Sequence, residues 1–202
     1  MQPTTTLSIT AVDAPEFDPF LAYLNDHLSD NGANGDGYFQ PLSRSASHFP
    51  ADRVAAFRNG LALPVGQAGW RRLWVARSAT GQILGHIDLR AHAERFTEHR
   101  CLLGMGIDRG HRQIGLGLQL IAHAADWAQA SGPLEWIDLQ VLSSNEKAIR
   151  LYGRYGFVKT GETPDMFQID GQKFAYTAMA KRLGGGWAGA EASVYPAAPG
   201  AR

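Results

Sequence analysis

The sequence predicts a mixed α/β domain in which helices flank a central sheet. Three observations predict it. Segments with strand-like apolar patterns are interspersed with segments of helical period. Turn-forming glycines separate several of these segments. The 202 residues, 45% of them hydrophobic and 19% charged, are sufficient for one sizeable core and typical of a soluble globular protein.

Charge and composition narrow the classes of function. The 19 basic residues balance the 19 acidic ones, so no global charge favours a nucleic-acid or membrane partner. Cys101 is the single cysteine, which excludes a disulfide within the chain and fits a reducing compartment. The N-terminal residues lack the pattern of a signal peptide, and no apolar run approaches the roughly 20 residues that span a bilayer. We therefore expect a cytoplasmic protein.

The first third of the chain predicts one strand and two helices. "LSITAV" (7–12) is typical of a strand. A helix is expected to follow, with Asp13 and Glu16 at capping-box spacing, although Pro19 weakens this prediction unless the helix begins later. "SDNGANGDG" is typical of a loop, and "ADRVAAFRNG" (51–60) of a second helix.

Strand patterns dominate the middle of the chain. "RLWVAR" (72–77) and "QILGHIDLRAH" (82–92) flank the turn "SATG" and predict a hairpin. "RCLLGMGID" (100–108) predicts a third strand. A helix is expected over 118–131, ended by Gly132 and Pro133.

The last third predicts a strand, a helix and a closing hairpin. "LEWIDLQVL" (134–142) alternates as a strand does, and Ser143 and Glu146 have capping-box spacing before the helix "EKAIRLYGRY". A hairpin is expected around Asp170 and Gly171.

These elements predict a single domain over residues 1–183. The segment 184–202 is rich in Gly, Ala and Pro and is expected to be a flexible tail. The alternative is that Trp187 or Tyr195 packs on a neighbour.

A glycine-rich stretch, "HRQIGLGLQL" (111–120), lies between a predicted strand and a predicted helix. The amino-terminal end of a helix offers unpaired N–H groups and the positive end of a dipole, which favour an anion. Glycines let the backbone approach such an anion closely. The Lys and Ser/Thr of a phosphate-binding P-loop are absent, and so is the third glycine of a dinucleotide fingerprint. The stretch does contain an R-x-x-G-x-G pattern. The alternative interpretation is a glycine-rich turn that binds no ligand.

This pattern resembles the pyrophosphate loop of the GCN5-related N-acetyltransferase (GNAT) superfamily. A second stretch, "LQVLSSNEKAIRLYGRYGFVKTGE" (139–162), resembles the second signature of the same family and follows in the same order. The resemblance covers residues 72–183 and is thinner over 1–71. It implies the acyl-CoA N-acyltransferase fold: a mixed, mostly antiparallel sheet, splayed between two parallel strands and flanked by helices.

The resemblance also implies acetyl-CoA as cosubstrate, with no metal. The pyrophosphate would be held by Arg112, Gln113, Ile114, Gly115, Leu116 and Gly117. Many relatives carry Gly where this chain has Gln113, and a side chain at that position would narrow the approach of the pyrophosphate. Backbone groups of Met105, Gly106 and Ile107 would pair with the pantetheine arm and stabilise a developing oxyanion. The alternative is that they pair with the next strand.

For two further residues, the resemblance implies a functional role, and a purely structural role is the alternative. Asn145 resembles the coenzyme-contacting Asn of the family, and its place before a helix would also make it a cap. Tyr152 resembles the general acid, since a phenol with a pKa near 10 can protonate a departing thiolate. It could instead be a core aromatic on a stripe with Ala148 and Tyr155.

A general base is not identified by the sequence. The candidates are His86, Asp88, His92, His99, Asp108 and Asp138. His86 and Asp88 would share one face of their strand. Cys101 has no signature of an acyl-enzyme nucleophile and is expected to be a buried, inert thiol.

We expect direct transfer of an acetyl group to the primary amine of a small molecule, such as an amino acid or a polyamine. A protein or peptide amine, and a non-catalytic CoA-binding module, are the alternatives, and a homodimer stays open. The acceptor would lie against 13–60 and 163–176. Its candidate contacts are aromatic or apolar (Tyr38, Phe39, Phe49, Phe57, Met166, Phe167), basic (Arg44, Arg53, Arg58) and acidic (Asp30, Asp36).

Overall fold

The computed structural model describes residues 7–33 and 37–184. Residues 185–202 of the predicted tail 184–202, which include Trp187 and Tyr195, lie outside the described residues, and so does Asp36. Seven strands form one sheet in the order β1-β2-β3-β4-β5-β7-β6. Their bounds are β1 Ser8–Ala11, β2 Arg71–Arg77, β3 Ile83–Arg90, β4 Arg100–Ile107, β5 Trp136–Leu142, β6 Val158–Ile169 and β7 Gln172–Arg182.

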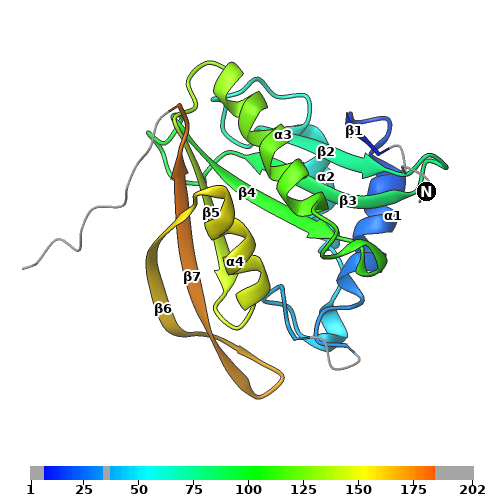
Figure 1. The fold of residues 1–202 in the computed structure, drawn as a ribbon, viewed down its shortest axis with the longest axis vertical. Helices are drawn as coiled ribbons and strands as arrows, with labels where there is room; N and C mark the ends of the chain where they lie inside the picture. The colour runs from blue at the N-terminus through cyan, green and yellow to red at the C-terminus, as the bar shows by residue number, and fades with distance from the viewer. Residues whose placement is uncertain (1–6, 34–36, 185–202) are drawn as a thin grey trace, which may run out of the picture.

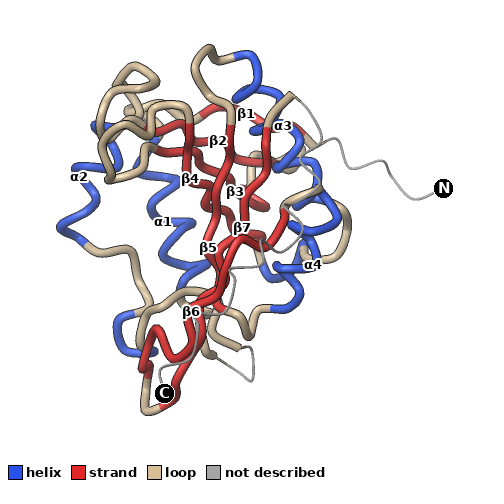
Figure 2. The backbone as a smooth tube through the Cα atoms, turned by 90° about the vertical axis from the view of Figure 1, so that its left-hand side faces the viewer, coloured by secondary structure: helices blue, strands red, loops and turns tan. Residues whose placement is uncertain are grey.

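Helices cover both faces of this sheet. Figures 1 and 2 show α1 (Phe17–Leu28) and α2 (Ala51–Gly60) on one face, and α3 (Leu116–Ala130) and α4 (Glu146–Tyr155) on the other. Two short 3-10 turns, η1 (Arg44–Ala46) and η2 (Arg109–His111), precede α2 and α3. The mixed sheet between helical layers confirms the predicted fold class.

The sheet splays where its two parallel strands meet. β4 and β5 pair only through Arg100–Trp136, Cys101–Ile137 and Leu102–Asp138. Beyond Leu102, β4 stays paired with β3 as far as Ile107, while β5 stays paired with β7 as far as Leu142. One edge of β4 is therefore open from Leu103 onward, as the family resemblance implied.

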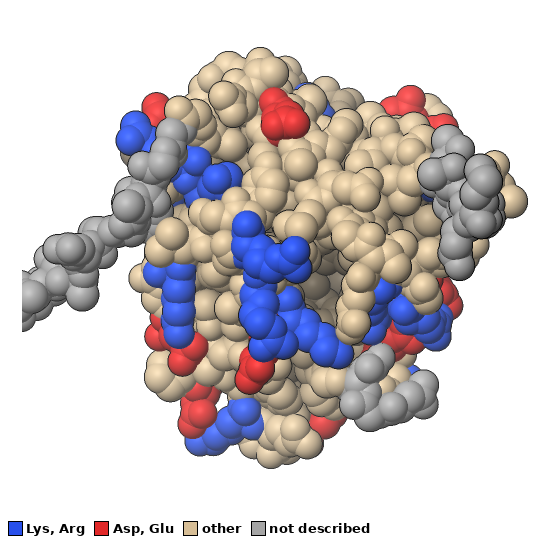
Figure 3. All heavy atoms as spheres, in the orientation of Figure 1, with Lys and Arg blue, Asp and Glu red and all other residues tan. Residues whose placement is uncertain are grey.

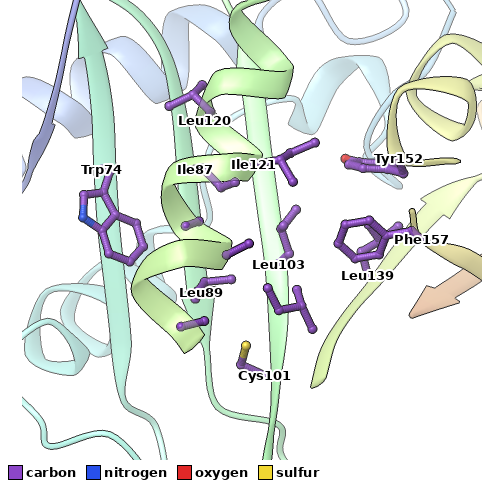
Figure 4. Packing of buried hydrophobic residues seen from close by; sticks show 14 of the residues in the cluster. Trp74, Ile87, Leu89, Cys101, Leu103, Leu120, Ile121, Leu139, Tyr152 and Phe157 are labelled. Carbon is purple, nitrogen blue, oxygen red and sulfur yellow. The ribbon is translucent and has the colours of Figure 1, made fainter. Parts of the chain in front are cut away.

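Two apolar clusters hold the layers together. The larger one packs α3 and α4 on the sheet and includes Leu120, Ile121, Leu139 and Phe157 (Figure 4). The smaller one packs α1 and α2 on the opposite face through Phe17, Phe20, Leu24, Leu28 and Phe57, together with Leu73, Val75 and Ile83 of the sheet.

Two helix caps differ from the prediction. α1 begins at Phe17, so Pro19 falls in its first turn, where a missing N–H removes no helical hydrogen bond. Asp13 does accept a hydrogen bond from the Glu16 N–H, but within the preceding turn. The expected Ser143–Glu146 capping box was wrong: Asn145 caps α4 by accepting from the Ala148 N–H.

β6 is much longer than predicted. It begins at Val158, because the stretch from Val158 to Thr163 pairs with β7, although "KTGETPD" contains Gly, Pro and Asp, which have low strand propensity. β6 is the edge strand of the sheet, where Pro164 removes no inner hydrogen bond, and its register shifts between Thr163 and Phe167. Within the part of the chain that the structure describes, every helix is too short or too polar to cross a membrane.

Candidate active site

The loop between β4 and α3 positions the backbone at the amino-terminal end of α3. Gly115 occupies the position before the helix with φ +87°, a left-handed conformation that side chains rarely adopt. The N–H groups of Leu116 and Gly117 open the helix, where no preceding turn can accept their hydrogen bonds. These donors suit a pyrophosphate, as the sequence implied.

Gln113 adopts a left-handed conformation without being a glycine, with φ +66°. Such a conformation costs a residue with a Cβ about 1–2 kcal/mol. The loop thus keeps the turn for which many relatives use Gly, at the expense of local strain. The Gln113 side chain is exposed.

Gly117 is needed for helix packing. It lies inside the first turn of α3, and a Cβ there would lie 2.8 Å from Cδ2 of Leu151 on α4. The predicted helix started after this residue. Its lack of a side chain lets α3 and α4 approach each other beside the splayed strands.

Arginines of the same loop are held by Asp30, which lies two residues after the end of α1. Asp30 is buried, its Oδ1 lies 2.8 Å from Nη1 of Arg109, and its Oδ2 lies 3.8 Å from Nη2 of Arg112. Arg112 also donates from Nε to the Ile107 carbonyl at 3.3 Å. Figure 3 shows basic side chains gathered around a hollow on the face of α3 and α4. The positive field and the free amides fit a phosphorylated coenzyme.

On the opposite face of β4, two histidines cover Gly106. A Cβ on Gly106 would lie 2.5 Å from Nε2 of His27 and 2.7 Å from Cε1 of His86. His27 comes from α1, and His86 from β3, where it pairs with Gly106. The imidazoles lie 5.9 Å apart between ring centroids, and Tyr23 stacks on His27.

Both imidazoles are neutral at physiological pH. Burial lowers the pKa of His27 to about 3, and the neighbouring His86 and Arg112 add to the fall. Burial likewise lowers the pKa of His86 to about 4, against the opposing effect of Asp88. His27 is only 8% exposed, and its Nδ1 has no hydrogen-bond partner among the described residues. This unpartnered nitrogen lies in a region that disfavours positive charge at the histidines.

Two residues away on the same face of β4, a carboxylate and a guanidinium cover Gly104. A Cβ on Gly104 would lie 2.6 Å from Oδ1 of Asp88 and 2.9 Å from Nη1 of Arg90. Asp88 Oδ2 is 3.0 Å from Arg90 Nη1 and 3.5 Å from Arg71 Nε. Arg71 in turn lies over the ring of Phe57, 3.8 Å from its centroid.

These groups line a cleft of about 700 Å³ between α1, α2 and the sheet. Its wall also includes Gln40 to Leu42, Phe49, Arg53 and Phe167. The loop that carries Gln40 is joined to the β6–β7 hairpin by Asp170, which accepts from the Tyr38 hydroxyl at 2.5 Å and from the Arg44 N–H at 2.8 Å. The hairpin and the loop thus form one continuous wall.

Tyr152 lies in the core and Asn145 caps a helix, as the structural alternatives for these two residues predicted. Tyr152 is buried in the larger cluster, edge-to-face with Phe157. Burial raises the pKa of its phenol above the usual range, and Tyr176 adds to the rise. Figure 4 shows its hydroxyl on the side of the ring that faces α3 and β4. The side-chain oxygen of Asn145 caps α4, as described above.

The six candidate bases lie at different places in the structure. Only His86 and Asp88 line the cleft, and Asp88 is engaged by two guanidiniums. Asp138 binds His92 at 2.9 Å and also Arg100, in a cluster at the paired end of β4 and β5. Asp108 contacts His111 at 2.8 Å and caps η2. His99 adjoins β4 at the same paired end, where its carbonyl accepts from the Glu135 N–H.

Some of the predicted acceptor contacts line the cleft, and others lie elsewhere. Those that line the cleft are Phe49, Arg53, Phe57 and Phe167. Arg44 donates to the Ser29 carbonyl, Arg58 pairs with Asp18, and Asp30 belongs to the loop arginines. Met166 is exposed.

Sequence reasoning missed His27, Arg71 and Arg90. His27 had a usable signal, because it lies three residues after Leu24 on the apolar face of its helix. Arg90 follows His86 and Asp88 at strand spacing, so the same face could have been extended to it. Arg71 had no such signal, since its place beside Asp88 depends on the β2–β3 register.

Cys101 is buried, as expected, and burial raises the pKa of its thiol to about 12. Among the described residues, no three His, Cys, Asp or Glu side chains are grouped so that they could hold a metal ion.

Comparison with known proteins gives three findings. The model of the Acetyltransferase (GNAT) family matches residues 45–157. The N-terminal acetyltransferase A complex catalytic subunit NAA10 of Arabidopsis thaliana is 28% identical over 100 residues, which are 50% of this chain. The chain spans about half the length of that curated relative, 52% of which is matched.

Solved structures are similar in fold. An acetyltransferase of the GNAT family from Streptococcus pneumoniae superposes with a TM-score of 0.72 at 24% identity, covering 89% of this chain and all of that one. Spermidine N-acetyltransferase from Vibrio cholerae, in complex with CoA and spermine, gives a TM-score of 0.66 at 20% identity, with 88% and 95% covered.

Proposed function

The chain belongs to the Acetyltransferase (GNAT) family, and on that premise we propose that it is an acetyl-CoA-dependent N-acetyltransferase, which acetylates the primary amine of a small molecule by direct attack in a ternary complex. Acetyl-CoA supplies the activated acetyl thioester. The chain supplies binding groups on both sides of the splay. Met105, Gly106, Ile107, the 112–117 loop and Asn145 are the proposed coenzyme contacts.

One observation carries this proposal: the open edge of β4 and the acceptor cleft meet at the same residues. Pairing with β5 ends at Leu102, and Gly104 and Met105, just beyond, line the cleft. An amine in the cleft and a thioester in the splay would therefore meet beside Gly106. This meeting point favours direct transfer, because no nucleophilic side chain has to carry the acetyl group between them.

His27 and His86 are proposed to receive the amine in its neutral form. The environment that lowers the pKa of both imidazoles also disfavours an ammonium, so the acceptor leaves one proton to solvent when it binds. The imidazole of His27 then accepts a hydrogen bond from the amine. After the nitrogen has attacked the acetyl carbon and the C–S bond has broken, the nitrogen gives up a second proton. This proton passes by way of the His27 imidazole to solvent. Solvent returns a proton to the phenolate that Tyr152 leaves when it protonates sulfur, so the net proton transfer is from nitrogen to sulfur.

The raised pKa of Tyr152 is compatible with its role as acid. A phenol is a weak acid, but a thiolate that departs beside the same apolar cluster is a stronger base than in water. Burial in that cluster acts on a thiol in this direction at Cys101, whose pKa it raises. The difference between the pKa of the Tyr152 phenol and the pKa of the departing thiol is thus smaller than the raised pKa of Tyr152 alone would indicate.

A small acceptor is favoured over a protein chain by the wall of the cleft. Asp170 joins the β6–β7 hairpin to the loop carrying Tyr38 and Arg44. An extended peptide would have to pass this wall, whereas a small molecule fits a volume of about 700 Å³. The likeness to a protein acetyltransferase subunit makes a peptide amine the alternative to test.

The experiment is a thiol-release assay on the full chain. Acetyl-CoA is incubated with amino acids, diamines, polyamines and short peptides, and free CoA is measured. The proposal expects amine-dependent release with small amines, and a higher melting temperature with acetyl-CoA; a ligand at 100 times its Kd adds about 2.7 kcal/mol. Release with peptides alone would replace it by the peptide alternative. A coenzyme shift without release for any amine would point to a CoA-binding module.

A further inference from the structure

The acceptor cleft holds more positive than negative charge. Its charged lining residues, among those the structure describes, are Arg53, Arg71, Arg90 and Asp88. The two histidines in the same wall are neutral, because burial lowers the pKa of each. Three guanidiniums therefore face one carboxylate, an arrangement that attracts anions.

The pairing around Asp88 leaves guanidinium donors to spare. Oδ2 of Asp88 is shared between Arg90 and Arg71, and the contact with Arg71 is the longer of the two, at 3.5 Å. The side chain of Arg71 is 19% exposed and that of Arg90 33%. Each guanidinium has five N–H donors in a planar fork that fits a carboxylate. Desolvated donors that a single carboxylate cannot satisfy are stabilised by a second one.

The spacing relates this charge to the reaction centre. Gly104 and Gly106 lie on the same face of β4, two residues and thus about 7 Å apart. The guanidinium of Arg90 covers Gly104, and the imidazole of His27 covers Gly106. Where the hydrogen bonds at the two ends run away from the strand rather than along it, this spacing leaves room for an amine and an anionic group that are separated by a few carbon atoms.

We propose that Arg71 and Arg90 form an anion subsite, and that the acceptor is a small amine bearing a carboxylate, of the amino-acid type. This inference rests on the proposed function and names its substrate class. The amine lies against the neutral histidines that cover Gly106, and the carboxylate lies against the two guanidiniums beside Gly104. Asp88 holds the guanidiniums in place between them. A polyamine would bring further positive charge to a cleft with three arginines, so it is a poor acceptor.

The test compares acceptors that differ only in charge. Steady-state kinetics are measured with an amino acid, its carboxamide and a diamine of similar length. The wild type should prefer the amino acid over the carboxamide by at least tenfold in kcat/KM. Arg90→Gln should reduce that preference about tenfold, mostly through KM, while kcat/KM for the carboxamide changes little. Arg90→Lys should retain part of it, since it keeps the charge and loses the fork.

Arg77→Gln is the matched control, because Arg77 lies at the far end of β2 and donates to the Gly81 carbonyl. It should leave the preference unchanged. Binding gives a readout apart from turnover: in the presence of CoA, the amino acid should raise the melting temperature of the wild type and not that of Arg90→Gln.

The outcomes separate this inference from the proposed function. Equal or better use of the carboxamide or the diamine by the wild type would overturn the anion subsite and leave the acetyltransferase intact. An equal loss for all three acceptors in Arg90→Gln would also overturn it, because the arginine would then serve the scaffold. Absence of release with every amine would count against the proposed function itself.

Discussion

Nε2 of His27 lies 2.5 Å from the position that a Cβ on Gly106 would take. Cε1 of His86 lies 2.7 Å from the same position. A helix and a strand far apart in the sequence thus place two imidazoles against one backbone position of β4, at the edge where the sheet opens.

We expect Gly106→Ala to abolish most of the acetyl transfer, because its methyl group would displace His27 or His86. The loss should reach about 100-fold in kcat/KM, the scale of a misplaced reactive group, while acetyl-CoA still raises the melting temperature. Gly153→Ala is the control: it lies in α4 with open space around its Cβ. It should retain activity and stabilise the helix by about 0.5–1 kcal/mol. An active Gly106→Ala enzyme would exclude this role for the histidines.

Tyr152→Phe should lower kcat by about 100-fold or more, as expected for the loss of a general acid. Its free energy of unfolding should change little, because the aromatic ring keeps its contact with Phe157. Rates with the preferred amine and chemical unfolding in urea measure the two quantities. Tyr155→Phe, on the same helix, should retain full activity. Unchanged kcat in Tyr152→Phe would reduce the residue to a packing role.

Two substitutions in the 112–117 loop should change stability in opposite directions. Gly115→Ala should destabilise the protein by about 1 kcal/mol, because φ at this position is +87° and an added Cβ favours negative φ. Gln113→Gly should stabilise it by up to about 1 kcal/mol, since the strain at φ +66° is relieved and part of the gain is lost to chain entropy. Urea unfolding of both variants checks the signs, and equal signs would contradict the loop geometry.

The buried histidines should make the protein less stable as the pH falls below 6.5. Their pKa values in the folded state, about 3 for His27 and about 4 for His86, lie below the usual 6.5. Between these values the unfolded chain binds protons that the folded chain does not, so stability rises with pH. Each histidine contributes up to about 1.4 kcal/mol per pH unit. Urea unfolding from pH 6.5 to 5 should show a smaller slope in His27→Gln; an unchanged slope would contradict burial of a neutral imidazole.

Asp170→Asn should weaken binding of the acceptor more than it slows the reaction. Hydrogen bonds from Tyr38 and the Arg44 N–H keep the pKa of Asp170 below its usual range, so its charge is used to join the hairpin to the loop. KM for the amine should rise severalfold with kcat nearly constant. Asp165→Asn, which loses an exposed pair with Lys173 on the same hairpin, should leave both unchanged. A fall in kcat alone would place Asp170 outside the cleft wall.

Local sequence signals predicted the elements whose bounds depend on turn residues and on the period of apolar residues. The 51–60 helix, the "SATG" hairpin and the end of α4 at Gly156 follow from turn residues and apolar period, and the structure confirms them. β6 was predicted too short because its amino-terminal half has poor strand propensity and is held by pairing with β7. The helix cap moved from Ser143 to Asn145 because Ser143 instead bonds Glu162 and Thr177.

The sequence by itself determined the layered α/β architecture, the glycine loop before α3 and the family, since these depend on residues that are near each other in the chain. Only the tertiary structure decided which groups face the acceptor. His27, His86 and Gly106 meet through the packing of α1 on β3 and β4, and Arg71 reaches Asp88 through the β2–β3 register. Such contacts join distant segments, and the period of any one segment does not encode them.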